Sequence, residues 1–178
     1  ENMKKIITIL LMIFLFTGCE IGTDMSNTPT KRVEEYLDGY QALDDNILND
    51  LDSLITDLDY TVEQKDSYRE LMKNHYQNLK YEIKDETING DKATVTAEIE
   101  VIDYSDVLKE ELDQDSYLDE EGNYNAELFY DYQLSKMKES KKKVKYTIVF
   151  NLTKVNDDWA IDELDESTKE KIHGIYVY

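Results

Sequence analysis

Apolar residues recur every three to four positions between residues 31 and 58, which is the spacing of one face of an α-helix. The stripe consists of Val33, Tyr36, Leu37, Tyr40, Leu43, Ile47, Leu48, Leu51, Leu54, Ile55 and Leu58. Thr28 and Pro29 precede it as an N-cap and a first helical residue. Gly39 and the pair Asp44-Asp45 interrupt the pattern, so we expect the stripe to bend or to divide into two helices.

Two further helices are indicated by capping boxes, in which a Ser or Thr side chain and a Glu or Gln three residues later satisfy free amides of the first turn. Thr61-x-x-Gln64 predicts a helix from about residue 62 to 78. Ser167-x-x-Glu170 predicts a short C-terminal helix that ends at Gly174.

Between residues 79 and 104 apolar residues occupy every second position, which predicts a β-hairpin with one buried and one solvent-exposed face. Its inward residues are Leu79, Tyr81 and Ile83 on one strand and Val95, Ala97, Ile99 and Val101 on the other. A two-residue Asn89-Gly90 loop would put these two sets on opposite faces of the sheet. We therefore expect a three-residue loop, Ile88-Asn89-Gly90, with Gly90 in the left-handed conformation and Ile83 paired with Val95.

A second hairpin follows, with inward residues Val144, Tyr146, Ile148, Phe150 and Leu152. A two-residue Asn156-Asp157 loop would set Leu152 opposite Ile161 and place Trp159 on the same face. The expected fold class is α+β, with N-terminal helices packed on one face of a four-stranded antiparallel sheet. A helical insertion, with helices near residues 105–112 and 124–140, separates the two hairpins.

A short apolar run at the N-terminus has the proportions of a signal peptide. Lys4 and Lys5 form its positive end, and its apolar core Ile6–Phe16 is shorter than the ~20 residues that a membrane-spanning helix requires. The Gly-, Ser- and Asn-containing segment that follows has no apolar period and predicts a flexible tether. The expected organisation is a signal peptide at 1–18, Cys19 and the tether at 19–30, and a single α+β domain at 31–178.

The stretch Leu15-Phe16-Thr17-Gly18-Cys19 resembles the lipobox of bacterial lipoproteins, in which a peptidase cuts just before a cysteine that receives lipid. The resemblance implies that Cys19 is the lipidation site, carrying acyl chains such as palmitate. It also implies that the protein is a lipid-anchored lipoprotein on the extracytoplasmic face of the cell membrane. Because Cys19 is the only cysteine, no internal disulfide supports the fold.

The order of elements, with "VEEYLDGYQALD" leading and "LKYEIKDETINGDKATVTAEIEVIDY" central, resembles uncharacterised membrane lipoproteins of Gram-positive bacteria (Firmicutes, clostridial). The resemblance covers about residues 30–178 and implies a compact NTF2-like or cystatin-like α+β domain. Its motifs are structural, so it implies no particular activity.

The net charge and the residue types present argue against several kinds of partner and site. The formal net charge is -20, and such an acidic surface argues against a nucleic-acid partner, which needs clustered Lys and Arg. We expect no cofactor, no metal site and no catalytic residue: His75 and His173 lie near helix ends, where surface or capping roles are typical, and one lipidated cysteine cannot complete a zinc site. The acidic stretch at 113–127 lacks the glycine that an EF-hand requires at its sixth position.

Two groups of residues are candidates for contact with a ligand. Tyr36, Tyr40, Tyr81, Tyr146 and Trp159 either form the edge of an amphipathic core or line a cleft between the first helix and the sheet. The lysine run 141–143, with Lys136, Lys138 and Lys145, either complements the C-terminus of the preceding helix or contacts an anionic lipid or wall polymer.

Two hypotheses for function follow. The favoured one is a lipid-anchored extracytoplasmic binding or interaction module, not an enzyme, whose partner is an unknown protein or cell-wall component at the cell surface. The alternative is an NTF2-like pocket protein that acts as a small-ligand binder or enzyme. A deep pocket with tyrosine hydroxyls and a buried carboxylate favours the alternative, and a filled interior with a flat apolar patch favours the first.

Overall fold

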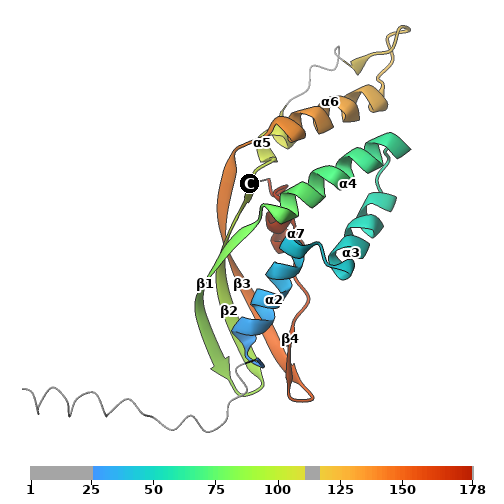
Figure 1. The fold of residues 1–178 in the computed structure, drawn as a ribbon. Coiled ribbons are helices and arrows are strands. Elements are labelled where there is room, and N and C mark those ends of the chain that lie inside the picture. The colour runs from blue at the N-terminus through green and yellow to red at the C-terminus, as the bar shows by residue number, and fades with distance from the viewer. Residues whose placement is uncertain (1–25, 111–116, 178) are drawn as a thin grey trace, which may run out of the picture.

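The computed structural model describes residues 26–110 and 117–177. Within these residues, six helices and one four-stranded antiparallel sheet form an α+β fold (Figure 1). The helices are α2 (Pro29–Ala42), α3 (Asp45–Thr56), α4 (Val62–Gln77), α5 (Ser105–Lys109), α6 (Ala126–Glu139) and α7 (Glu166–His173). The strands are β1 (Lys80–Asn89), β2 (Lys92–Ile102), β3 (Lys143–Val155) and β4 (Asp158–Ile161), ordered β1-β2-β3-β4.

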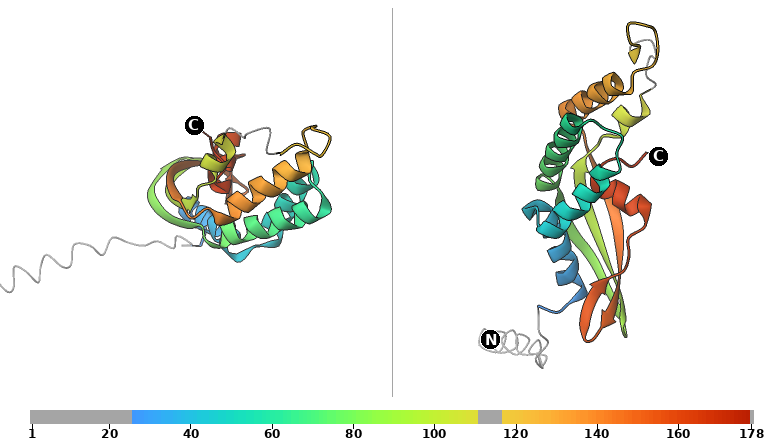
Figure 2. Two further views of the ribbon diagram at one scale, coloured as in Figure 1. Left: turned by 90° about the horizontal axis from the view of Figure 1, so that it is seen from above. Right: turned by 90° about the vertical axis from the view of Figure 1, so that its right-hand side faces the viewer.

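The helices cover one face of the sheet, and the curved sheet partly encloses α2 and α7 (Figure 2). α2 contacts β1, β2 and β4, α7 contacts β2, and α4 packs against α2, α3 and α6. The core lies between these layers, where Val95, Ala97, Ile99, Phe150 and Leu152 are fully buried. This confirms the expected fold class, and the arrangement is consistent with NTF2-like or cystatin-like domains.

The N-terminal apolar stripe forms two helices, as its interruptions predicted. The Thr28 side chain caps α2 by accepting a hydrogen bond from the amide of Lys31, with Pro29 in the first turn. The helix ends at Leu43, which adopts the left-handed conformation (φ 56°) and lets Asp44 turn back over Gly39. A Cβ on Gly39 would lie 3.2 Å from Asp44 Oδ2, so the absence of a side chain there makes room for the turn.

Of the two predicted capping boxes, the one at the start of α4 is present and the one at the start of α7 is not. Thr61 and Gln64 form the full capping box at the start of α4. The expected Ser167 cap of α7 is wrong, because Asp165 is the N-cap and its side chain accepts a hydrogen bond from the Thr168 amide at 2.7 Å. Ser167 already lies in the first helical turn. Gly174 ends the helix with φ 70°, as expected.

The first hairpin has a shorter loop than the sequence indicated. Asn89 pairs with Lys92, which leaves Gly90 and Asp91 as a two-residue loop, so the predicted three-residue loop is wrong. Ile83 pairs with Ala97 instead of Val95, and a bulge lies between Ile83 and Asp85. The extra residue in the bulge restores the alternation, so the apolar sets still share one face. The positive φ predicted for Gly90 is confirmed at 62°.

The second hairpin agrees with the prediction. Val155 pairs with Asp158, Leu152 pairs with Ile161, and Trp159 is buried. Asn156 and Asp157 both have positive φ, 51° and 68°, which is the backbone twist favoured in two-residue hairpin loops.

The insertion between the hairpins carries α5 and α6. α5 covers the start of the expected helix at 105–112, and α6 begins at Ala126, two residues later than the expected helix at 124–140. The delay has a local cause: the Asn125 side chain caps α6 by accepting hydrogen bonds from the amides of Glu127 and Leu128.

The N-terminal segment that bears the lipobox lies outside the described residues, as does Cys19. None of the helices at 26–110 or 117–177 is long and apolar enough to cross a membrane. α2 begins at Pro29, so the last two residues of the expected tether belong to the folded part.

Candidate functional site

A cleft of about 330 Å³ opens where α2, α3, α4 and α7 meet. We call it the tyrosine cleft. It is lined by Tyr36 and Tyr40 from α2, Ile47, Asp50, Leu51 and Leu54 from α3, Tyr76 from α4, and Lys169 and His173 from α7. The left-handed break at Leu43 creates this arrangement, because it turns α3 away from the line of α2 and leaves a space between them.

Three tyrosine rings form the inner wall of the tyrosine cleft. Tyr36 and Tyr40 are one helical turn apart, and their hydroxyl oxygens lie 3.1 Å from each other. The Tyr40 ring packs edge-on against Tyr76, with ring centroids 4.9 Å apart. Tyr36 packs in the same manner on Phe150 of β3, at 6.0 Å, so the wall rests on the sheet. Such edge-to-face contacts hold the rings in defined orientations.

The tyrosine hydroxyls of the cleft remain protonated at neutral pH. Burial raises the pKa of Tyr36, Tyr40 and Tyr76 above the ordinary tyrosine value, and the nearby negative charge of Asp50 raises each pKa further. A protonated hydroxyl both donates and accepts hydrogen bonds. The wall therefore presents polar points on an aromatic surface.

His173 closes the α7 side of the cleft as a neutral ring. Burial lowers its pKa to about 4, and the positive charge of Lys169 lowers it as well. The imidazole lies against Tyr76, with ring centroids 5.7 Å apart. At neutral pH it therefore offers one donor and one acceptor nitrogen and no charge.

Two opposite charges flank the tyrosine cleft. Asp50 on α3 and Lys169 on α7 are both exposed, and no ion pair links them within the residues that the structure describes. A ligand in the cleft would thus meet a carboxylate from one helix and an ammonium from another.

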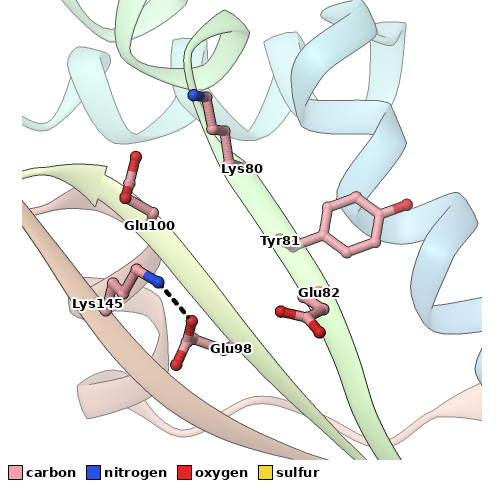
Figure 3. A pocket seen from close by; sticks show the side chains of 6 residues that line it. All are labelled: Lys80, Tyr81, Glu82, Glu98, Glu100 and Lys145. Carbon is pink, nitrogen blue, oxygen red and sulfur yellow. Dashed lines mark hydrogen bonds and ion pairs between the residues drawn. The ribbon is translucent and has the colours of Figure 1, made fainter.

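Only two of the five residues proposed from the sequence lie in the tyrosine cleft, namely Tyr36 and Tyr40. The ring of Tyr81 points towards α2, where its hydroxyl donates a 2.6 Å hydrogen bond to Asp38 (Figure 3). Tyr146 packs against Tyr176, and the ammonium of Lys171 lies over both rings.

Trp159 belongs to β4 and lies away from the cleft, with its side chain on the core side of the sheet. Its ring is buried, and its backbone carbonyl accepts a 2.8 Å hydrogen bond from Arg32 Nε. The five residues are therefore not brought together between the first helix and the sheet. The space there is filled by core side chains, and the cleft lies between helices instead.

Most of the cleft residues were not predicted as site residues. Ile47, Leu51 and Leu54 belong to the helical stripe seen in the sequence, which marks them as inward-facing without saying what they face. Tyr76 and His173 come from helices far apart in the chain. Only the packing of α7 against α4 unites them, and no local pattern encodes that contact.

A shallower hollow of about 160 Å³ lies on the outer face of the sheet (Figure 3). It is lined mainly by charged side chains, including Lys80, Glu82 and Glu100. Lys145 and Glu98 form a 2.8 Å ion pair across it. Because these charges are opposite and adjacent, they largely neutralise one another, and the hollow is a weaker candidate than the tyrosine cleft.

No group of three His, Cys, Asp or Glu side chains within 26–110 and 117–177 is arranged to hold a metal ion. In the acidic segment, Asp119 accepts hydrogen bonds from the amides of Glu121 and Asn123, and so closes its own loop. That carboxylate has a structural role in the turn.

Comparisons with protein-family models, curated proteins and solved structures found no match to this chain. The fold class therefore rests on the observed topology, and any statement about function rests on the geometry and electrostatics of the tyrosine cleft together with the N-terminal sequence.

Proposed function

We propose that this protein is a lipid-anchored extracytoplasmic binding module that holds a small ligand in the tyrosine cleft and is not an enzyme. The observation that carries the proposal is the cleft itself, with three tyrosine rings, a neutral imidazole and two flanking charges. Its volume of about 330 Å³ is within the range of small-molecule sites in proteins.

The lining indicates the chemistry of the ligand. Tyr36, Tyr40 and Tyr76 offer aromatic faces and edges, which favour a flat or apolar group. Their protonated hydroxyls favour a ligand with a hydrogen-bond acceptor such as a carbonyl or an ether oxygen. Asp50 and Lys169 could form ion pairs with a polar or zwitterionic end of the ligand that faces solvent.

The pKa shifts favour binding over proton transfer. General acid–base catalysis works best when the pKa of the catalytic group is near the working pH. The tyrosine pKa values are raised, and the pKa of His173 is lowered to about 4, so each moves away from neutrality. Groups tuned in this way donate and accept hydrogen bonds without changing their protonation.

The anchoring part of the proposal rests on the sequence Leu15-Phe16-Thr17-Gly18-Cys19. Acyl chains on Cys19 would each contribute about 0.8 kcal/mol per buried CH₂, and two chains suffice for stable anchoring. The folded part begins close behind Cys19, at the Thr28 cap of α2, so the domain would lie near the membrane on a short tether.

The tyrosine cleft can be tested with small aromatic probes. The full chain, labelled with ¹⁵N in zwitterionic micelles, is titrated with phenol, p-cresol and indole, and amide shifts are followed by NMR. We expect saturable shifts that cluster on α2, α3 and α7 around the cleft.

A matched pair of variants controls this experiment. Leu54→Trp places a larger ring in the cleft and is expected to abolish the clustered shifts, whereas Leu58→Trp makes the same change at a partly buried position outside it. Partition of the probes into micelles affects both variants equally. Shifts that persist unchanged in Leu54→Trp, or that never cluster at the cleft, would show that it is not a binding site.

A further inference from the structure

A second cavity, of about 270 Å³, lies where the ends of α4 and α6 meet the junction of β2 and β3. We call it the lysine cavity. Its polar lining consists of Asn74, Asn78, Lys138, Ser140, Lys141 and Lys143. Three ammonium groups thus surround one hollow on a protein with 40 acidic and 20 basic residues.

The lysines of this cavity differ in how they are neutralised. Lys142, the middle residue of the run, forms ion pairs of 2.8 Å with Asp106 and 3.2 Å with Asp103, and it does not line the cavity. Lys143 lies 3.4 Å from Glu100. Lys138 and Lys141 form no ion pair with any residue of the described part of the chain, although carboxylates are twice as frequent as basic groups.

The helix ends do not cancel this positive charge. α4 and α6 both end at the cavity, and each C-terminus carries the equivalent of about half a negative charge. The three lysines that line the cavity, less Glu100 and less the two helix ends, leave about one positive charge. Lys142 with Asp103 and Asp106 adds about one negative charge next to the cavity but outside its lining. Complementing the helix ends therefore accounts for only part of the lysine cluster.

An amide donor stands beside the uncompensated lysines. The side chain of Asn78 donates to the backbone carbonyl of Asn74 at 2.8 Å and to its Oδ1 at 3.3 Å. Because Oδ1 of Asn74 accepts in this pair, its NH₂ group is left to point elsewhere, and Asn74 lines the cavity. Ammonium groups and an amide donor around a concave surface are what an oxyanion requires.

We propose that the lysine cavity binds the phosphate group of an anionic ligand, a phosphate mono- or diester. Lys138 and Lys141 provide the charge, and the Asn74 amide donates a hydrogen bond. A phosphate monoester carries about -1.5 to -2 at neutral pH, which exceeds the residual positive charge of the cavity, so one phosphate group is sufficient to neutralise it.

The lysine cavity and the start of α2 lie at different ends of the sheet. β3 begins at Lys143 beside the cavity and runs to Val155, a length of about 40 Å for its 13 residues. At the far end, the side chain of Asn27 donates a hydrogen bond to the carbonyl of Asp157, where the tether enters the domain. The start of α2 and the start of β3, where the cavity residue Lys143 lies, are thus at opposite ends of the sheet (Figure 1).

The test is a phosphate titration of the full chain in zwitterionic micelles at constant ionic strength, followed by ¹⁵N NMR. Sodium phosphate and glycerol 3-phosphate are the probes. We expect saturable shifts at the cavity with a dissociation constant of roughly millimolar size, and binding about tenfold weaker in the double variant Lys138→Gln/Lys141→Gln. Lys138→Arg/Lys141→Arg should keep most of the affinity.

The control is Lys31→Gln/Lys154→Gln, which removes the same charge at the opposite end of the sheet and should bind phosphate as the natural chain does. Equal affinity in the two Gln variants, or no shifts at the cavity, would overturn the proposal. Because Lys138 and Lys141 are exposed, the fold should be unaffected, which far-UV circular dichroism checks.

A second arm identifies the source of the phosphate. Unlipidated Cys19→Ala chain is sedimented with vesicles of phosphatidylglycerol or of phosphatidylcholine. We expect no lysine-dependent binding to either, which supports a ligand distant from the membrane. Binding to phosphatidylglycerol that is lost in Lys138→Gln/Lys141→Gln supports the same phosphate site and assigns its source to a lipid headgroup.

Discussion

At the scale of single residues, the least expected feature is the buried surroundings of His75. The sequence placed it near a helix end, where a surface or capping role is typical, yet its side chain is fully buried. Its Nε2 lies 2.8 Å from the carbonyl oxygen of Ile172, so it joins α4 to α7. Next to it, Gly174 is close-packed, because a Cβ there would overlap the carbonyl oxygen of Ile102. These contacts hold α7, and with it one side of the tyrosine cleft.

The burial of His75 predicts a dependence of stability on pH. Burial lowers its pKa from 6.5 to about 4, so between these values the unfolded chain binds more protons than the folded one. Stability due to neutral His75 is present above pH 6.5 and is lost as the pH falls towards 4. The full loss is of order 3 kcal/mol, of which about 2 kcal/mol falls between pH 7 and pH 5.

Urea unfolding at pH 7 and pH 5 measures this effect. His75→Gln keeps a donor for Ile172 and removes the titrating ring, so its free energy of unfolding should fall by about 2 kcal/mol less between the two pH values than that of the natural chain. Carboxylate titration is common to both proteins and cancels in the comparison. Equal losses in both proteins would contradict the assignment.

At the scale of elements, local sequence patterns predicted most helices and strands, and the errors have local physical causes. The two-residue loop Asn156-Asp157 followed from residues that tolerate positive φ. The first hairpin was misjudged because a bulge after Ile83 adds one residue to β1, and alternation alone cannot reveal where such a residue is inserted. At α7 the pattern Ser167-x-x-Glu170 predicted the wrong cap, because Asp165, two residues earlier, accepts the hydrogen bond from the Thr168 amide.

The N-cap of α7 gives a direct prediction. Asp165→Ala removes the side chain that accepts from the Thr168 amide and should lower the melting temperature by about 2–4 °C. Ser167→Ala, in the first turn of the helix, is the matched control and should change it by less than about 1 °C. Differential scanning calorimetry decides between them, and a larger effect of Ser167→Ala would mean that the helix starts later than the structure shows.

At the scale of the whole molecule, the start of α2 and the proposed phosphate site lie at different ends of the sheet. Asn27, just before α2, contacts the hairpin of β3 and β4. α6, whose C-terminal end contributes to the lysine cavity, lies at the other end of the sheet (Figure 1). A net charge of -20 repels other polyanions at long range, so an anion would be accepted only where lysines gather. The tyrosine cleft lies between these ends, among α2, α3, α4 and α7.

The proposed anchor at Cys19 belongs to this scale, because it would decide where the molecule resides. Cys19→Ala should abolish lipid modification, so the chain either remains uncleaved or is released from the membrane. Detergent phase partition and intact-protein mass spectrometry measure both outcomes. Thr17→Ala, which keeps Gly18 and Cys19, is the control and should remain anchored. A mature, lipid-modified Cys19→Ala protein would refute the lipobox interpretation.

Local sequence patterns were sufficient to predict the α+β class, the presence of two hairpins and the division of the first helix, and they carry the expectation of a lipidated Cys19. Each of these depends on residues close together in the chain, where hydrophobic period, capping and turn chemistry act directly. The tyrosine cleft and the lysine cavity, by contrast, arise from tertiary packing. Their walls come from helices and strands far apart in sequence, and the packing of α7 on α4, through His75 and Gly174, has no local signature.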